Sequence, residues 1–290
     1  MASRASKIAK RTLVGGTLAV VLGLFLREAY WSPSGFVVWA GAAVLGAGCI
    51  YEVGRMSSYI PRGVRLPLWF GWLLALSPGA LVYLGIEDRI GFDIYPAYPS
   101  AANAALGYAV AFLGVVFAGL VMGAGLRNIR RLAFLALWLP APLVSLAAIW
   151  AAFGPNGLLA LILLSKIGDV FGYYVGNALG KSHPFPKTSP GKTTAGCVAS
   201  LIAGTLGGGL CAWFELLPGG RDALVPGLAA GALINLAAQA GDLLESRVKR
   251  AAGVKDSGTW FGPSGGVLDL VDSLLLAVPA ALLTWPWLFA

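Results

Sequence analysis

The stretch GDLLESRVKRAAGVKDSGTWFGPSGGVLDLVD, residues 241–272, decides how the rest of this chain is interpreted. Apolar segments flank it on both sides, yet it holds five of the thirteen carboxylates in the chain and four cations. These charged residues are Asp242, Glu245, Asp256, Asp269, Asp272, Arg247, Lys249, Arg250 and Lys255. We therefore expect the chemistry of the protein in this charged interruption.

The composition around that stretch is that of an integral membrane protein. Hydrophobic residues make up 58% of the 290 residues and charged residues only 12%, whereas soluble domains carry about 25% charged residues. No separate soluble domain is expected. We predict one membrane domain over residues 1–290, with N-terminal helices in 1–155 and catalytic helices and loops in 156–290.

Nine apolar runs approach the length needed to cross a bilayer, so we predict an all-α polytopic membrane helix bundle of about nine transmembrane helices. The first run, residues 12–26, follows the basic flank MASRASKIAKR and could be a signal peptide. It lacks a small-residue cleavage site before a soluble chain, so we interpret it as an uncleaved span. The other eight are expected at residues 35–53, 67–86, 101–125, 132–152, 157–179, 195–217, 223–243 and 267–289.

Lys and Arg residues are distributed unevenly between the two sides of this topology. One set of alternate loops carries seventeen of them and the opposite set carries three, Arg27, Arg89 and Arg221. Because cytoplasmic loops are the basic ones, this predicts a cytoplasmic N-terminus and a cytoplasmic-face active site, in a cell's inner (plasma) membrane. The net charge of +8 then follows from topology, and no nucleic acid partner is expected.

Charged residues inside predicted spans are costly and therefore informative. Lys166 and Asp169 lie three positions apart on one helix face, where a structural ion pair is the simplest interpretation. On the same helix Gly168, Gly172, Gly176 and Gly180 form a stripe that allows a helix or a ligand to approach closely.

The loop KSHPFPKTSPGKTTAG, residues 181–196, combines hydroxyls, lysines and a Ser189-Pro190-Gly191 turn before a predicted helix. Such a loop offers donors and a close backbone approach to phosphate. It lacks the GxxxxGK[ST] pattern, and a solvated basic loop is the alternative.

Two acidic pairs flank the opening stretch at the ends of neighbouring predicted helices. Asp242 and Glu245 share nearly one face with Ser246, and Asp269 and Asp272 share another. Carboxylates brought together at a membrane surface repel unless a cation lies between them, and oxygen ligands of this kind suit Mg²⁺. Acids, bases and glycines at a membrane face point to a phosphate ester and a divalent metal.

Residues 246–272 read SRVKR, four residues, KDSG, two residues, FG, one residue, and SGGVLDLVD. This pattern resembles the signature of the phosphatidate cytidylyltransferases, or CDP-diacylglycerol synthases. Residues 169–196 resemble the second block of that family, an Asp before Y-x-x-G, then G-K, S-P-x-K-T and a final Gly. Three positions differ: Ser264 stands where the family usually has His, Leu270 where it has Arg, and Ala195 where an acidic or amide residue is common.

The resemblance implies the reaction of CTP with phosphatidate to give CDP-diacylglycerol and pyrophosphate, with Mg²⁺ as cofactor. It implies Asp242 and Asp269 as metal ligands and a catalytic set that also includes Lys249, Arg250, Lys255, Asp256 and Asp272. Within that set the basic residues, with Lys192, would bind phosphates. The implied substrate-binding residues are Asp169, Ser189, Lys192, Thr193, Ser246, Gly265 and Gly266.

The acyl chains of the lipid substrate would remain in the bilayer, and a homodimer is a candidate assembly. Two other functions remain open at this point. One is a CTP-dependent transferase acting on another lipid phosphate. The other is a transporter of an anionic substrate, which would not need the carboxylate pairs.

Overall fold

The computed structural model describes residues 4–31, 36–56, 65–73, 76, 112–123, 125–262 and 265–289, and this part is helical without strands. The predicted all-α class is thus confirmed for these residues. Its labelled helices are α1 (Arg4–Trp31), α2 (Phe36–Arg55), α6 (Leu126–Trp138), α7 (Pro140–Leu179), α8 (Thr194–Trp213), η1 (Gly220–Ala223), α9 (Leu224–Ala251), α10 (Val267–Val271) and α11 (Leu274–Leu288). Two further helical pieces cover residues 65–73 and Phe112–Val121.

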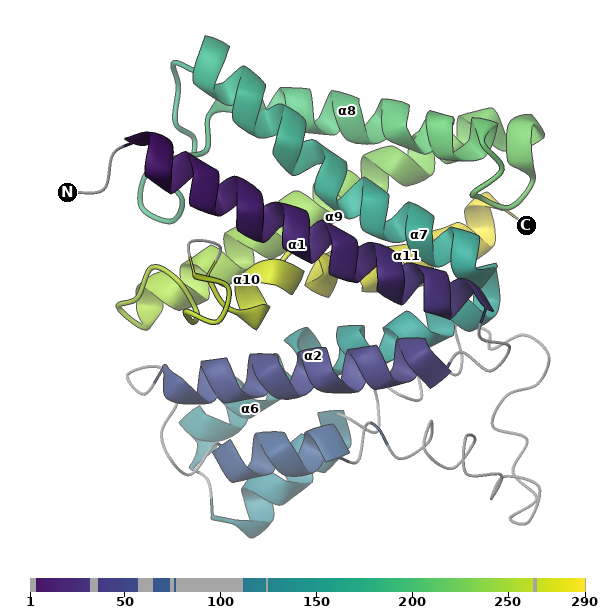
Figure 1. Cartoon of the computed structure of the whole chain (residues 1–290). Coiled ribbons are helices and arrows are strands. Elements are labelled where there is room, and N and C mark those ends of the chain that lie inside the picture. The colour runs from purple at the N-terminus through teal and green to yellow at the C-terminus, as the bar shows by residue number, and fades with distance from the viewer. Residues whose placement is uncertain are drawn as a thin grey trace, which may run out of the picture.

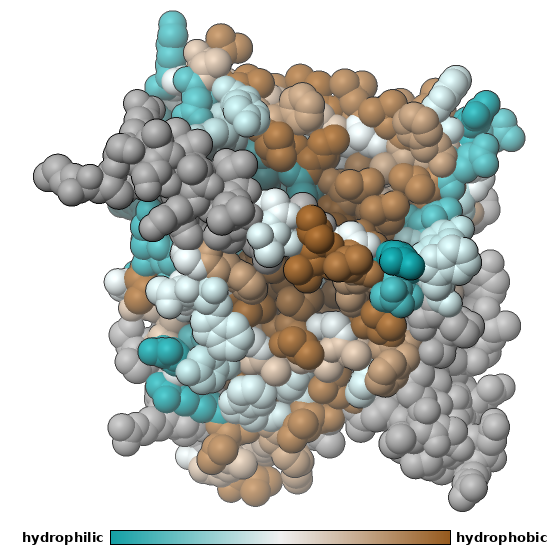
Figure 2. Space-filling model, in the orientation of Figure 1, coloured by the Kyte–Doolittle hydropathy of each residue, from teal (hydrophilic) through white to brown (hydrophobic). Residues whose placement is uncertain are grey.

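Five helical stretches in the described part are long and apolar enough to cross a membrane: Phe36–Arg55, Arg127–Leu179, Thr194–Trp213, Gly220–Ala251 and Val267–Leu288. Figure 2 shows apolar side chains over the middle of one face, with hydrophilic ones gathered mostly toward its margins. Helix α1 covers the predicted first span. Most of the predicted span 67–86, residues 101–111 and 124 of the predicted span 101–125, and all of the loop 87–100 lie outside the described residues.

The predicted spans 132–152 and 157–179 fall within one helical stretch of 53 residues. Helix α7 kinks at Gly154, whose φ of 69° is in the left-handed region that glycine tolerates. Pro155 follows and begins the second arm, where its missing N–H leaves no helical hydrogen bond unmade. The two arms leave the kink in different directions (Figure 1), so the break that the sequence predicted between these spans is present.

Glycine contacts hold α7, α8 and α9 together. The stripe on α7 packs on α8, since a Cβ at Gly172 would lie 3.1 Å from the Gly196 carbonyl oxygen. On the other side of α8, a Cβ at Gly208 would lie too close to the Gly227 carbonyl oxygen of α9 for any side chain. Small residues therefore allow backbone-to-backbone packing on both faces of α8.

Helix α9 continues to Ala251, two turns beyond the predicted end at residue 243. The prediction of a loop from residue 244 was wrong up to residue 251 because Val248 is buried in the core and Glu245 pairs with Lys249 one turn later. The predicted last span matches the helical stretch Val267–Leu288, in which α10 and α11 join at Asp272 and Ser273 with helical φ/ψ at both residues. In Figure 1 the loops on either side of α8 and α9, residues 180–193 and 252–262, gather at the same end of the bundle as the C-terminal end of α2.

Candidate active site

Helix α9 presents Asp242, Glu245, Ser246 and Lys249 on neighbouring turns at that end of the bundle. Lys192, which precedes α8, places its Nζ 2.6 Å from Asp242 Oδ2. Ser246 donates to Asp242 Oδ1 over 3.4 Å. This ion pair joins the predicted phosphate-binding loop, residues 181–196, to the charged stretch, residues 241–272. The two segments were predicted to lie on the same side of the membrane.

Three carboxylates from two segments form one cluster. Asp242, Glu245 and Asp272 each offer an oxygen within 4.8 Å of the others. Glu245 is fully buried, and neither of its oxygens receives a hydrogen bond of good geometry, although Lys249 Nζ lies 2.6 Å from Oε2. Clustered oxygen ligands with buried, unsatisfied lone pairs fit a hard divalent cation such as Mg²⁺.

Asp269 lies on the other side of Lys249 from this cluster. Its Oδ1 is 2.5 Å from Lys249 Nζ. Its Oδ2 accepts from Ser257 Oγ at 2.6 Å, Ser257 N at 2.8 Å and Gly266 N at 2.7 Å. The acids at the two helix ends therefore meet as expected, but the role of Asp269 as a metal ligand stays a prediction.

Lys166 pairs with Asp272 at 3.2 Å across the bundle. The expected ion pair with Asp169 on the same helix does not form in the described part of the chain, because the Lys166 side chain reaches the junction of α10 and α11 instead. Asp169 is left facing the cavity between α7 and α8.

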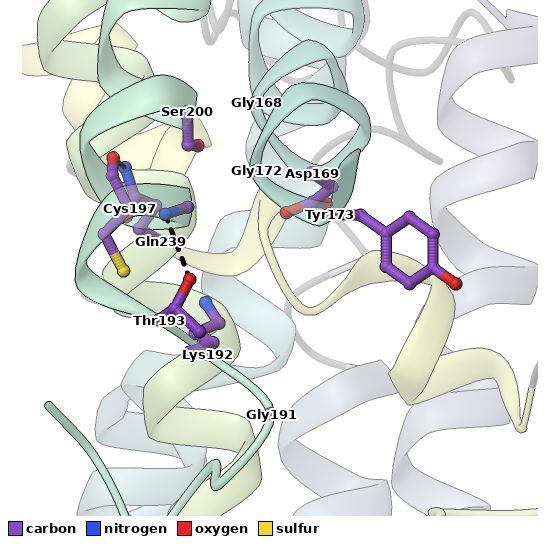
Figure 3. Close-up of a pocket in the computed structure, with 11 residues that line it drawn as sticks. Gly168, Asp169, Gly172, Tyr173, Gly191, Lys192, Thr193, Cys197, Ser200 and Gln239 are labelled. Carbon is purple, nitrogen blue, oxygen red and sulfur yellow. Dashed lines mark hydrogen bonds between the residues drawn. The ribbon is translucent and has the colours of Figure 1, made fainter. Parts of the chain in front are cut away.

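That cavity has a volume of about 170 Å³ and is lined by residues of α7, α8, α9 and the loop before α8. Three predicted substrate-binding residues line it: Asp169, Lys192 and Thr193. Figure 3 shows the Asp169 carboxylate directed toward α8 and the Tyr173 ring pointing away. Gln239 of α9 lines it too, donating to Asn235 Oδ1 at 2.8 Å.

The loop before α8 forms the predicted turn. The Lys192 N–H donates to the Ser189 carbonyl at 3.1 Å, which closes the turn over Pro190 and Gly191. Thr193 is the N-cap of α8 and its Oγ1 accepts from Gly196 N at 3.1 Å. Because accepting leaves the hydroxyl proton free, Thr193 can still donate to a phosphate oxygen.

The remaining predicted residues lie around the 252–262 loop. Lys255 and Asp256 are exposed on it, and Arg250 donates from Nη1 to the Val254 carbonyl at 3.1 Å. Gly265 and Gly266 are buried, and Gly265 has a φ of 85°, which favours glycine.

Two residues that the sequence did not point to complete the site. Glu52 of α2 is only 1% exposed and accepts from Val267 N and Leu268 N, both at 2.9 Å. Ser257 lies between the carboxylates of Glu52 and Asp269. The signal that could have revealed Glu52 is the one applied to Lys166, a charged residue within a predicted span.

The positions that differ from the family pattern have distinct surroundings. Leu270 is partly buried and packs against the apolar core, where an Arg would bring a charge. Ala195 lies in the first turn of α8. Ser264 lies outside the described residues.

Comparisons with known proteins agree on one family. Residues 10–285 match the model described as "Cytidylyltransferase family". A phosphatidate cytidylyltransferase of Brucella abortus biovar 1 (strain 9-941) is 33% identical over 271 residues, covering 91% of this chain and 89% of that protein. Those of Mycobacterium leprae (strain TN) and Aquifex aeolicus (strain VF5) are 35% and 37% identical, covering 56% and 42% of this chain and 50% and 44% of the relatives.

Proposed function

The chain belongs to the cytidylyltransferase family, and from this premise we propose that it transfers a cytidylyl group from CTP to phosphatidate, releasing CDP-diacylglycerol and pyrophosphate. One observation carries the proposal to this chain's own residues. The Lys192–Asp242 pair, at 2.6 Å, joins a hydroxyl- and lysine-bearing loop to a carboxylate cluster. A reaction between two polyanions needs both kinds of group in one place.

The phosphatidate phosphate is the nucleophile and needs little help from a base, since a phosphate monoester with a second pKa near 6 is largely ionised at pH 7. The demand on the protein is to neutralise charge and to orient the two substrates for in-line attack on the α-phosphorus. Lys192, Arg250 and Lys255 would bind phosphate oxygens, with Ser189 and Thr193 donating hydrogen bonds. Lys249, held between Glu245 and Asp269, would chiefly order these two carboxylates.

Asp242, Glu245 and Asp272 would hold Mg²⁺, with Asp269 as the further predicted ligand. When bound, the cation supplies neutralisation of the nucleotide phosphate oxygens and of the pyrophosphate formed. Asp256 at the exposed loop and Asp169 in the cavity would orient the nucleotide.

The membrane arrangement is part of the proposal. The asymmetry of Lys and Arg supports about nine spans, a cytoplasmic N-terminus and an active site at the cytoplasmic face of the inner membrane. The acyl chains would then stay in the bilayer while the headgroup enters between helices. The homodimer remains a proposal of the same rank.

The test is synthesis of CDP-diacylglycerol from labelled CTP and phosphatidate in detergent micelles. We expect turnover with Mg²⁺ and none with a chelator. Asp242→Asn and Asp269→Asn should each lower kcat by about 100-fold or more, whereas the exposed Asp222→Asn should not. Wild-type turnover in both site variants would refute their roles. Turnover of another lipid phosphate but not of phosphatidate would change the substrate assignment.

A further inference from the structure

Helix α2 contributes a buried carboxylate to the active-site end of the bundle. Glu52 is 1% exposed, and a charged group in the membrane interior costs several kcal/mol unless it is well partnered. Its partners are Val267 N at 2.9 Å, Leu268 N at 2.9 Å and, at 2.7 Å, the Ser257 hydroxyl, whose single proton it shares with Asp269. All three belong to the segment that contains Asp269.

The contacts continue from Glu52 to the acid cluster. Ser257 Oγ lies 2.7 Å from Glu52 Oε2 and 2.6 Å from Asp269 Oδ2. Asp269 contacts Lys249, whose Nζ lies 2.6 Å from Glu245 Oε2. An unbroken series of polar contacts therefore runs from α2 to the carboxylates of α9.

Two glycines make room for the Glu52 carboxylate. A Cβ at Gly258 would clash with Glu52 Oε1, and a Cβ at Gly266 would clash with both carboxylate oxygens. The loop also packs on α2 through Trp260 and Tyr51, whose ring centroids are 5.9 Å apart. The loop of residues 252–262 therefore packs closely against this end of α2.

We propose that Glu52 is a positioning residue for the proposed transfer reaction. It holds Ser257 and the backbone of Val267 and Leu268, so that Asp269 and Lys249 keep their positions relative to the Asp242, Glu245 and Asp272 cluster. Both carboxylate oxygens are needed. A glutamine would turn one of them into a donor facing a backbone N–H.

The kinetic test of this proposal rests on the proposed function. It uses Glu52→Gln, Ser257→Ala and the double variant in the full-length protein. Ser145→Ala is the matched control, because Ser145 is buried and its hydroxyl donates within α7, to the Ala141 carbonyl. The monodisperse gel-filtration fraction of each protein is collected, and its kcat, its KM for CTP and its thermal unfolding midpoint are measured.

We expect Glu52→Gln to lower kcat at least 10-fold and Ser257→Ala to lower it about 5-fold, with KM for CTP changed less than 3-fold. The double variant should be no worse than Glu52→Gln, since the two residues act in one series of contacts. Ser145→Ala should keep the wild-type kcat. Gly258→Ala, which changes no polar group, should reproduce the kcat loss by displacing the carboxylate.

Several outcomes would overturn the positioning role. One is Glu52→Gln with at least half of the wild-type kcat, and another is additive effects of the two substitutions. A third is kcat losses that only follow the thermal midpoint. If Glu52→Gln does not fold, Ser257→Ala and Gly258→Ala decide alone, and wild-type kcat in both refutes the proposal.

A readout without turnover separates this proposal from the proposed function. Trypsin cleavage after the exposed Lys255 should be at least 5-fold faster in Glu52→Gln than in wild type or Ser145→Ala, because the loop loses its attachment to α2. If Glu52→Gln is cleaved faster but the wild type shows no turnover, the proposed reaction is refuted and the attachment of the loop to α2 is supported. Unchanged cleavage would refute the attachment.

Discussion

At the scale of single residues, Lys249 is the centre of the site. Its side chain is 10% exposed, and its ammonium group lies between the carboxylates of Glu245 and Asp269, at 2.6 and 2.5 Å. The sequence predicted a basic residue that binds substrate phosphate. The structure places this charge between the buried carboxylate of Glu245 and the partly buried carboxylate of Asp269, where it can offset the repulsion between them.

Replacing Lys249 should therefore destabilise the fold as well as the site. Lys249→Met leaves the buried Glu245 carboxylate and the partly buried Asp269 carboxylate without their cation and should cost about 3–5 kcal/mol of unfolding free energy. The double variant Glu245→Gln with Lys249→Met should recover part of it. Thermal unfolding in detergent measures both, with the exposed Lys181→Met as control. An unchanged midpoint in Lys249→Met would show that the lysine does not stabilise the cluster.

At the scale of elements, α8 is the helix around which the catalytic half packs. Glycines and small residues line its contact with α7 through Gly196 and Ser200 and its contact with α9 through Gly204 and Gly208. Between apolar helices in lipid, close packing supplies much of the stabilisation. The position of Lys192 and Thr193 depends on this packing because they immediately precede α8.

A single added methyl group should test that dependence. Gly208→Ala places a Cβ against the backbone of Gly227 and Gly231, so the helices must separate, at a cost of about 1–3 kcal/mol. We expect a lower thermal midpoint in detergent. Gly23→Ala is the control, because nothing lies within 4 Å of a Cβ there. Equal midpoints for the two variants would mean that α8 and α9 do not need this approach.

At the scale of the whole molecule, the two halves of the chain meet at the active site. Glu52 of α2 accepts hydrogen bonds from Val267 N and Leu268 N at the N-terminus of α10 and from Ser257 Oγ of the loop before it. The boundary near residue 155 marks the kink of α7 and does not divide the function.

The proposed orientation in the membrane can be tested by cysteine labelling. Lys187 and Arg221 are exposed in connections at opposite ends of α8. In an active variant with the three native cysteines replaced by alanine, Arg221→Cys should react with a membrane-impermeant maleimide in intact cells. Lys187→Cys should react only in inverted vesicles. Labelling of Lys187→Cys in intact cells would reverse the orientation.

Much of the site was predictable because its residues lie close together along the chain. Asp242 and Glu245 share a helix face with Ser246 at intervals of three and four residues, which the sequence shows directly. Lys249 joins that face only because α9 continues to Ala251. Glu52 was missed because it lies about two hundred residues from its partners, and no local period indicates such a pairing. The Lys166–Asp272 pair was missed for the same reason.

The sequence by itself determined the membrane class, the helical spans that the structure describes and the acids and bases of the charged stretch. These features follow from composition and local periodicity, which can be read directly from the amino-acid sequence. Only the tertiary structure decided which carboxylates share one cluster, which lysine each of them contacts and how α2 enters the site. Those relations depend on helix packing across the bundle. Residues 241–272 form a site only together with Glu52 of α2, Lys166 of α7 and Lys192 of the loop before α8.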